Sequence, residues 1–255
     1  MFNFLNELPL MLLTLPAILL SLSIHEAAHG FVAYKLGDPT AKNLGRLTLN
    51  PLKHINLFGF ISMLFFRVGW ANPVPINTRN FKNPRRDMAI SAAAGPISNL
   101  CLATIFTILL RITLIGINSI SEGALVIVGN RYWIDESLRE NTLFMVLSLF
   151  AVMFSLGISL NINLMFFNLI PLPPLDGSRI AYIFLPTETY FKIMRYERYI
   201  MIGFIILFAT GILNTPLAYL NNGMTDLLYK ATGMPEGLLG VVLNELINRL
   251  PQFTL

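Results

Sequence analysis

The sequence predicts an all-α polytopic membrane protein with about four transmembrane helices. Three observations carry this prediction: 55% of the 255 residues are hydrophobic and only 13% are charged, the mean hydropathy is +0.63, and long uncharged runs recur along the chain. A soluble domain is about a quarter charged, so this composition excludes a soluble single-core enzyme and a disordered chain. The apolar runs do not alternate with polar residues, which argues against a membrane β-barrel.

Four uncharged runs predict the transmembrane helices. The first helix is expected over 8–36; the run lacks the basic segment that precedes a secretory signal peptide. The second is expected from 88 to about 117. The third lies within 141–175 and is followed by the proline-rich sequence NLIPLPPLDG, and the fourth is expected over 199–225.

Two further apolar segments are too short to span a bilayer. The run 55–66 has 12 residues, whereas a span needs about 20. Its flanking sequences, LGRLTLNP and ANPVPIN, alternate and carry prolines as short edge strands do. We therefore expect a short re-entrant β segment, shielded at membrane depth by protein or a water cavity. After Lys230, the sequence GLLGVVLNELINRL predicts a short amphipathic helix on the membrane surface.

The chain is expected to form one integral membrane domain over 1–255. Its core would cover 8–180, and the fourth span and the amphipathic tail would lie in 181–255. The net charge of +4 is modest and bears on membrane orientation rather than on nucleic acid, which we do not expect as a partner. The single cysteine, Cys101, allows no internal disulfide and no thiolate metal cluster.

Basic residues predict the orientation. Between Lys35 and Arg86 there are nine lysines and arginines but one acidic residue, Asp38. The loop 119–142 carries two basic and four acidic residues, and the segment 179–198 is again rich in basic residues. Basic loops remain in the cytoplasm. The protein is therefore expected to cross the cell membrane several times, with its N-terminus outside.

The pentapeptide HEAAH at 25–29 provides the first candidate site. On a helix, residues four apart share a face, so His25 and His29 can present their imidazoles to one zinc ion. Glu26 lies next to His25, where a carboxylate can take a proton from the attacking water. A chance match is disfavoured, because a charged group inside the membrane costs about 2.5–3.5 kcal/mol.

A hydrolytic zinc site needs a third protein ligand and one open position. Asp176 is the leading candidate, because it ends the longest uncharged run near the depth expected for 25–29; a helix N-cap after the prolines is the alternative role. His54 could ligate metal or line a substrate groove, but a basic residue at the interface beside Lys53 is slightly preferred over ligation. Asn168 could donate a hydrogen bond to a developing oxyanion.

Four motifs together resemble the site-2 protease family of intramembrane zinc metalloproteases. They are HEAAHG, GWANPVPIN with NPRRD after it, AAAGPISNL and FNLIPLPPLDGSR, which follow one another over about 25–180. We expect no inserted PDZ domain, since no stretch is long enough for one, and no CBS-like tail after the fourth span. The resemblance is therefore to a compact form of the family.

The resemblance implies a three-helix catalytic core and one zinc ion per chain. It implies that His25, His29 and Asp176 are the zinc ligands and that Glu26 is the catalytic glutamate. Asn168 matches an asparagine that the family places near the substrate carbonyl. The resemblance also implies that an unwound substrate pairs with the residues Val74, Pro75, Ile76 and Asn77.

Two classes of function fit these observations. The first is an intramembrane zinc metalloprotease that hydrolyses peptide bonds within or near the transmembrane segments of membrane proteins, with its active site toward the cytoplasm. Its partners would be the lipid bilayer and a transmembrane protein or peptide substrate. The alternative is a metal-binding membrane transporter or a non-catalytic membrane scaffold, and Glu26 argues against it, since a transit site needs no carboxylate beside the ligand pair. A zincin with a glutamate as third ligand is a further alternative.

We predict that the segment 35–86 faces the cytoplasm, because its basic residues favour that side. A single cysteine placed at Asn80, with Cys101 replaced, should react with a membrane-impermeant reagent in inverted vesicles and not in intact cells. Reaction from the external side alone would reverse the orientation and the depth argument for the candidate site.

Overall fold

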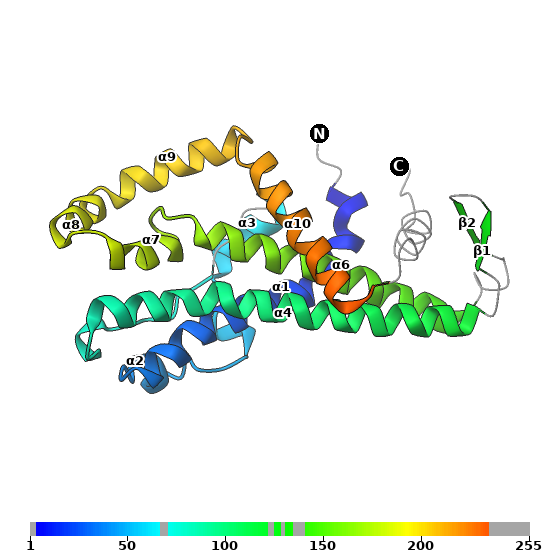
Figure 1. The fold of residues 1–255 in the computed structure, drawn as a ribbon, viewed down its shortest axis with the longest axis horizontal. Helices are drawn as coiled ribbons and strands as arrows, with labels where there is room; N and C mark the ends of the chain where they lie inside the picture. The colour runs from blue at the N-terminus through cyan, green and yellow to red at the C-terminus, as the bar shows by residue number, and fades with distance from the viewer. Residues whose placement is uncertain (1–3, 67–70, 122–124, 129–130, 135–140, 235–255) are drawn as a thin grey trace. The chain divides into compact units, whose positions relative to one another are not determined.

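Three long helices dominate the computed structural model, which describes residues 4–66, 71–121, 125–128, 131–134 and 141–234 (Figure 1). Helix α1 covers Phe4–Lys35, α4 covers Pro84–Ser121 and α6 covers Thr142–Leu169. Each is long and apolar enough to cross a bilayer, over Met11–Lys35, Pro84–Ile120 and Thr142–Leu169 respectively. These helices agree with the first three expected spans and make the chain a mostly helical protein with three candidate membrane-spanning helices.

Shorter elements connect and follow the long helices. Before α4 come α2 (Thr40–Asn43), the 3₁₀ turn η1 (Pro51–Lys53), α3 (Leu57–Phe66) and η2 (Thr78–Asn80). After α6 come α7 (Asp176–Ala181), η3 (Tyr182–Phe184), α8 (Thr187–Arg195), α9 (Glu197–Ala209) and α10 (Asn214–Thr232). Between α4 and α6, β1 (Leu125–Val128) pairs with β2 (Arg131–Ile134) in an antiparallel hairpin, which the sequence analysis did not predict.

The predicted re-entrant β segment is not confirmed in the residues that the structure describes. Its apolar run forms helix α3, and in its flanks an isolated antiparallel bridge joins Ile55 to Ala71. Residues 72–77 form no strand. Pro73 and Pro75 have no N–H to donate, and the N–H groups of Asn72, Val74 and Asn77 bond to His54, Glu26 and Asp38.

The fourth span predicted over 199–225 is not confirmed as a single helix. This run is divided between α9 and α10 by a turn at 210–213. Gly211 has a φ of +74° in this turn, a conformation that glycine adopts at little cost and that ends the helix. The amphipathic helix predicted for the tail lies outside the described residues.

By its internal contacts the chain forms two compact units. Unit 1 contains the described parts of 1–17, 103–159 and 226–255, and unit 2 contains 18–102 and 160–225. Within unit 2, the amide of Asn161 on α6 donates a buried hydrogen bond of 2.8 Å to the Ser21 hydroxyl on α1. Every candidate site residue lies in unit 2. The proposed core over 8–180 stays a prediction.

Candidate metal centre

Helix α1 brings His25 and His29 together on one face. Each residue is 7% exposed. The two Nε2 atoms are 3.1 Å apart, and the rings stand nearly perpendicular, at 89°, with centroids 4.6 Å apart. The helical spacing of four residues therefore produces the paired imidazoles expected from the sequence.

Asp176 completes the group from the first residue of α7. Its Oδ2 lies 3.2 Å from Nε2 of His25 and 3.3 Å from Nε2 of His29. Leu175 is the N-cap residue of α7, and no side chain caps this helix, so the alternative role of Asp176 as an N-cap is wrong. The carboxylate is directed at the imidazoles instead.

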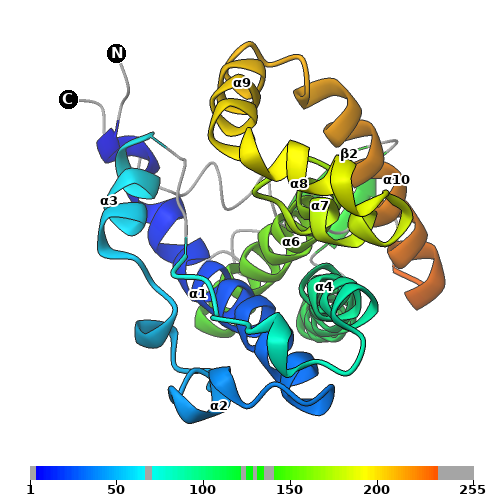
Figure 2. The ribbon, with the colours of Figure 1, turned by 90° about the vertical axis from the view of Figure 1, so that its left-hand side faces the viewer.

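Gly177 explains how Asp176 reaches this place. A Cβ at Gly177 would collide with the carbonyl oxygens of Leu169 and Ile170, and would lie 2.5 Å from the carbonyl carbon of Leu169. The start of α7 therefore packs directly on the backbone at the end of α6 (Figure 2). A glycine at this position permits the tight turn that follows the prolines.

The three side chains fit a metal ion. Their ligand atoms all lie within 4.8 Å of one another. Nδ1 of His29 lies 2.8 Å from the Ser91 carbonyl oxygen; because a carbonyl only accepts, this nitrogen carries the proton and Nε2 carries a lone pair. Oδ2 of Asp176 is buried and has no partner in hydrogen-bond geometry. Two imidazoles and one carboxylate, with one ring held by a backbone carbonyl, are typical of a catalytic zinc site.

The carboxyl of Asp176 is in the form that binds metal. Burial by itself would raise the pKa of Asp176, but contacts with the imidazoles of His25 and His29 outweigh burial and lower the pKa to about 2. The carboxyl is therefore ionised at neutral pH, as metal ligation requires.

Helix α4 covers the imidazoles with backbone rather than with side chains. An ideal Cβ at Gly95 would lie 2.5 Å from Cε1 of His29 and 2.6 Å from Cε1 of His25. Ser91, one turn earlier on α4, supplies the carbonyl that holds His29. Neither role was predicted from the sequence. The small residues of AAAGP were a signal for close packing at Gly95, whereas a backbone carbonyl leaves no mark in the sequence.

Glu26 does not belong to this group of three but is held next to His25 by a different partner. Its Oε2 accepts a hydrogen bond of 2.8 Å from the backbone N–H of Val74. Val74 is 7% exposed, and it begins the segment that the sequence analysis assigned to substrate. The structure therefore brings the expected catalytic glutamate and the expected substrate segment together.

Asp38 anchors the far end of that segment. It is completely buried and accepts hydrogen bonds from the backbone N–H of Asn77 at 2.7 Å, from the Asn80 amide at 2.7 Å and from the backbone N–H of Thr40 at 3.1 Å. Burial by itself would raise the pKa of Asp38, but hydrogen bonds from these residues lower it. The sequence analysis counted Asp38 only as the single acid among basic residues and missed this anchoring role.

His54 and Asn168 are not part of the group of three. His54 is 1% exposed, and its Nε2 lies 2.8 Å from the Thr48 carbonyl oxygen, so it is a buried histidine rather than an exposed base at the interface. Asn168 is half-buried and donates a hydrogen bond of 2.9 Å to the Leu164 carbonyl of its own helix. Its side-chain amide has a second N–H that could serve a ligand.

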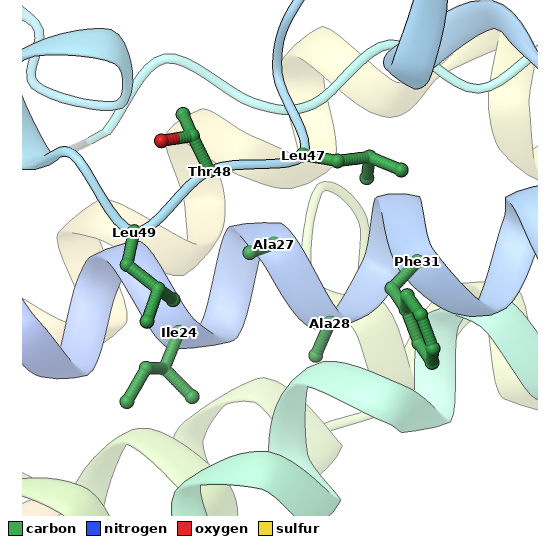
Figure 3. Close-up of a pocket in the computed structure, with 7 residues that line it drawn as sticks. All are labelled: Ile24, Ala27, Ala28, Phe31, Leu47, Thr48 and Leu49. Carbon is green, nitrogen blue, oxygen red and sulfur yellow. The ribbon is translucent and has the colours of Figure 1, made fainter.

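An open groove of about 380 Å³ lies along another face of the same turns of α1 (Figure 3). Four residues of α1 line one side, and the loop residues 47–49 line the other: Ile24, Ala27, Ala28, Phe31, Leu47, Thr48 and Leu49. Apart from Thr48 these side chains are apolar. None of them is a member of the candidate metal centre, so this groove is separate from it.

We predict that Gly95→Ala abolishes metal binding, because the new methyl group would overlap both imidazoles. Gly116→Ala on the same helix is the matched control: its Cβ would lie 3.5 Å from Leu147, an ordinary contact. Metal analysis of the two purified variants checks the prediction. One bound metal ion in the Gly95 variant would show that α4 does not need glycine there.

Comparisons with known proteins agree with this centre. The model of peptidase family M50 matches residues 13–210. A Bacillus subtilis (strain 168) protein named "Putative zinc metalloprotease YwhC" is 40% identical over 207 residues, which are 81% of this chain and 83% of that protein. "Putative zinc metalloprotease Rip2" of Mycolicibacterium smegmatis (strain ATCC 700084 / mc(2)155) is 34% identical over 106 residues, 39% of this chain and 40% of its own. No solved structure matches the chain significantly. The chain therefore belongs to peptidase family M50, the site-2 protease family of zinc metalloproteases.

Proposed function

We propose that this protein is a zinc metalloendopeptidase that hydrolyses peptide bonds within or near the transmembrane segments of membrane proteins. The observation that carries the proposal is the convergence of His25, His29 and Asp176 beside a glutamate in the same helical motif. Membership of peptidase family M50 supports the hydrolytic class.

The location of the imidazoles supports cleavage at membrane depth. His25 and His29 lie inside Met11–Lys35, and Gly95 lies inside Pro84–Ile120, both of which are apolar enough to cross a bilayer. Ionisable groups at such depth are costly and are typical of function. In the proposed orientation, the protein crosses the cell membrane with its N-terminus outside and its active site toward the cytoplasm.

Each polar residue has a role in the proposed reaction. His25, His29 and Asp176 would hold zinc, which would supply Lewis acidity to the attacking water and to the peptide carbonyl. Glu26 takes a proton from that water and passes it to the nitrogen of the leaving amine. The second N–H of the Asn168 amide donates to the substrate carbonyl oxygen, where negative charge develops.

The segment 74–77 is the proposed docking site for an unwound substrate. Backbone groups of residues two apart point to the same side of an extended chain, so the carbonyls of Val74 and Ile76 share one edge. Pro75 has no N–H, and the N–H of Asn77 is used by Asp38. An extended substrate would therefore pair with the two carbonyls and with the N–H of Ile76.

A metal transporter or a scaffold is the alternative from another class. Such a protein could use the same two imidazoles as a transit site, but it would have no use for a carboxylate held beside them. Cleavage of a model transmembrane peptide by the purified zinc-loaded protein supports the protease. Zinc flux in proteoliposomes without cleavage would favour the transporter instead.

We predict that Glu26→Gln retains one zinc ion per chain and abolishes cleavage. Glutamine is similar in size and can still accept the Val74 hydrogen bond, but it cannot take a proton at neutral pH. Metal analysis and cleavage of a model transmembrane peptide check both parts. Normal turnover by this variant would rule out Glu26 as the general base.

We predict that Asp176→Ala strongly weakens zinc binding and stops cleavage, while His54→Ala leaves zinc near one per chain. The reason is that Asp176 lies within 3.3 Å of both imidazole nitrogens, whereas His54 bonds to the Thr48 carbonyl. Zinc retained by the Asp176 variant and lost from the His54 variant would mean that the third ligand is wrongly assigned.

A further inference from the structure

We propose that the segment 72–77 is a positioning element for the general base, in which the N–H of Val74 aims the Glu26 carboxylate. The inference rests on the proposed function for the role of Glu26. It adds that the same stretch of backbone serves both the substrate and the catalytic glutamate. Val74 acts through Glu26 and is therefore a positioning residue.

The sequence NPVPIN makes Val74 a unique donor. Pro73 and Pro75 have no N–H, so Val74 is the one residue in 73–75 whose backbone can donate. That donor lies 2.8 Å from Oε2 of Glu26. A hydrogen bond to an ionised carboxylate is among the stronger and more directional ones, so this contact fixes where the carboxylate lies.

Gly30 explains why the Val74 side chain can come so close to α1. An ideal Cβ at Gly30 would lie 2.8 Å from Cγ1 of Val74, 2.8 Å from Cδ2 of Leu47 and 3.0 Å from Cβ of Ala41. Gly30 follows Glu26 by four residues, so both lie on the same face of the helix. A glycine inside a helix is unfavourable relative to alanine, and the close approach of Val74 is the reason we infer for it.

Two side chains hold the segment against this face. Asp38 accepts the hydrogen bond from the Asn77 backbone at one end. At the other end, Nη2 of Arg46 lies 2.6 Å from the Asn72 carbonyl oxygen and 3.4 Å from that of Pro73. The N–H of Asn72 also donates to the His54 carbonyl at 2.6 Å. The segment is therefore fixed on both sides of Val74.

The Val74 N–H can have one of two roles, and the two differ in their effect on KM and kcat. If it pairs with substrate, its loss weakens binding and raises KM. If it aims Glu26, its loss leaves binding largely intact and lowers kcat, since a small misplacement of a catalytic group can cost about 100-fold in rate. The occupied hydrogen bond in the structure favours the second role.

Kinetics of two substitutions at one position test the proposal. Val74→Pro removes the N–H within a segment that already accommodates two prolines, and Val74→Ala trims the side chain but keeps the N–H. The kcat of Val74→Pro should fall about 100-fold below that of Val74→Ala, with similar KM values and one zinc per chain in both. A rise in KM without a fall in kcat would overturn the proposal.

Gly30→Ala should perturb the hydrogen bond between Val74 and Glu26 from helix α1. It therefore controls for local effects of the new proline in Val74→Pro. It should lower kcat and retain zinc, because its methyl group displaces Val74 and lies on the face that carries Glu26, away from the imidazoles. Normal kcat in Gly30→Ala would overturn the proposal.

Amide hydrogen exchange provides a readout that needs no turnover. In Glu26→Ala, exchange of the Val74 N–H should rise by about tenfold or more, while the Asn77 N–H, held by Asp38, should exchange as before. Because this experiment is independent of cleavage, it tests the positioning role even where no peptide is hydrolysed. Unchanged exchange at Val74 would overturn the proposal, whereas absent cleavage by the zinc-loaded wild type would count against the proposed function.

Discussion

The candidate site depends on how closely bare backbone can approach helix α1. Two imidazoles and a carboxylate occupy one face of this helix, and the backbone of α4 lies directly over them at Gly95. On the neighbouring face, Gly30 leaves room for the side chain of Val74. A side chain at Gly95 would fill the space that the imidazoles use, and one at Gly30 would fill the space that Val74 uses. Close packing of this kind is the ordinary role of small residues between membrane helices, and here it also shapes the centre.

The carboxylates of Asp38, which is buried, and Asp176, which is half-buried, are held by different kinds of partner. Asp38 accepts hydrogen bonds from backbone and side-chain N–H groups, whereas Oδ2 of Asp176 faces the two imidazole nitrogens without hydrogen-bond geometry. A buried charge needs such compensation, because its desolvation is otherwise costly. The negative charge of Asp38 is compensated by hydrogen bonds within the protein, so its role is structural. The carboxylate of Asp176 is suited to binding a cation, because its Oδ2 has no hydrogen-bond partner.

The sequence predicted those features that depend on local patterns. Uncharged runs located α1, α4 and α6, and the spacing of HEAAH placed His25 and His29 on one face. Asp176 was found because it ends the longest uncharged run. Features that depend on tertiary approach were not predicted. The run 55–66 contains helix α3, and the segment 72–77 forms no strand because the N–H groups of Val74 and Asn77 bond to Glu26 and Asp38. Periodicity does not reveal such partners.

The break between α9 and α10 is a second feature that the pattern of uncharged runs did not predict. The run 199–225 is uncharged throughout, so composition alone favours one long helix. Gly211 is a single residue in that run, and a glycine inside an apolar helix is common in membrane proteins. Whether it breaks the helix depends on its φ of +74°, which the uncharged composition of the run does not reveal.

The motif HEAAHG can now be understood as two pairs of residues rather than one metal-binding signature. His25 and His29 form one pair four residues apart, and Glu26 and Gly30 form the next. Because successive residues of a helix are rotated by about 100°, the second pair faces a different neighbour from the first. The imidazoles face α4 and Asp176, while Glu26 and Gly30 face the segment 72–77. Metal binding and aiming of the base thus rest on separate contacts of one helix turn, which is why substitutions on one face can be expected to spare the other.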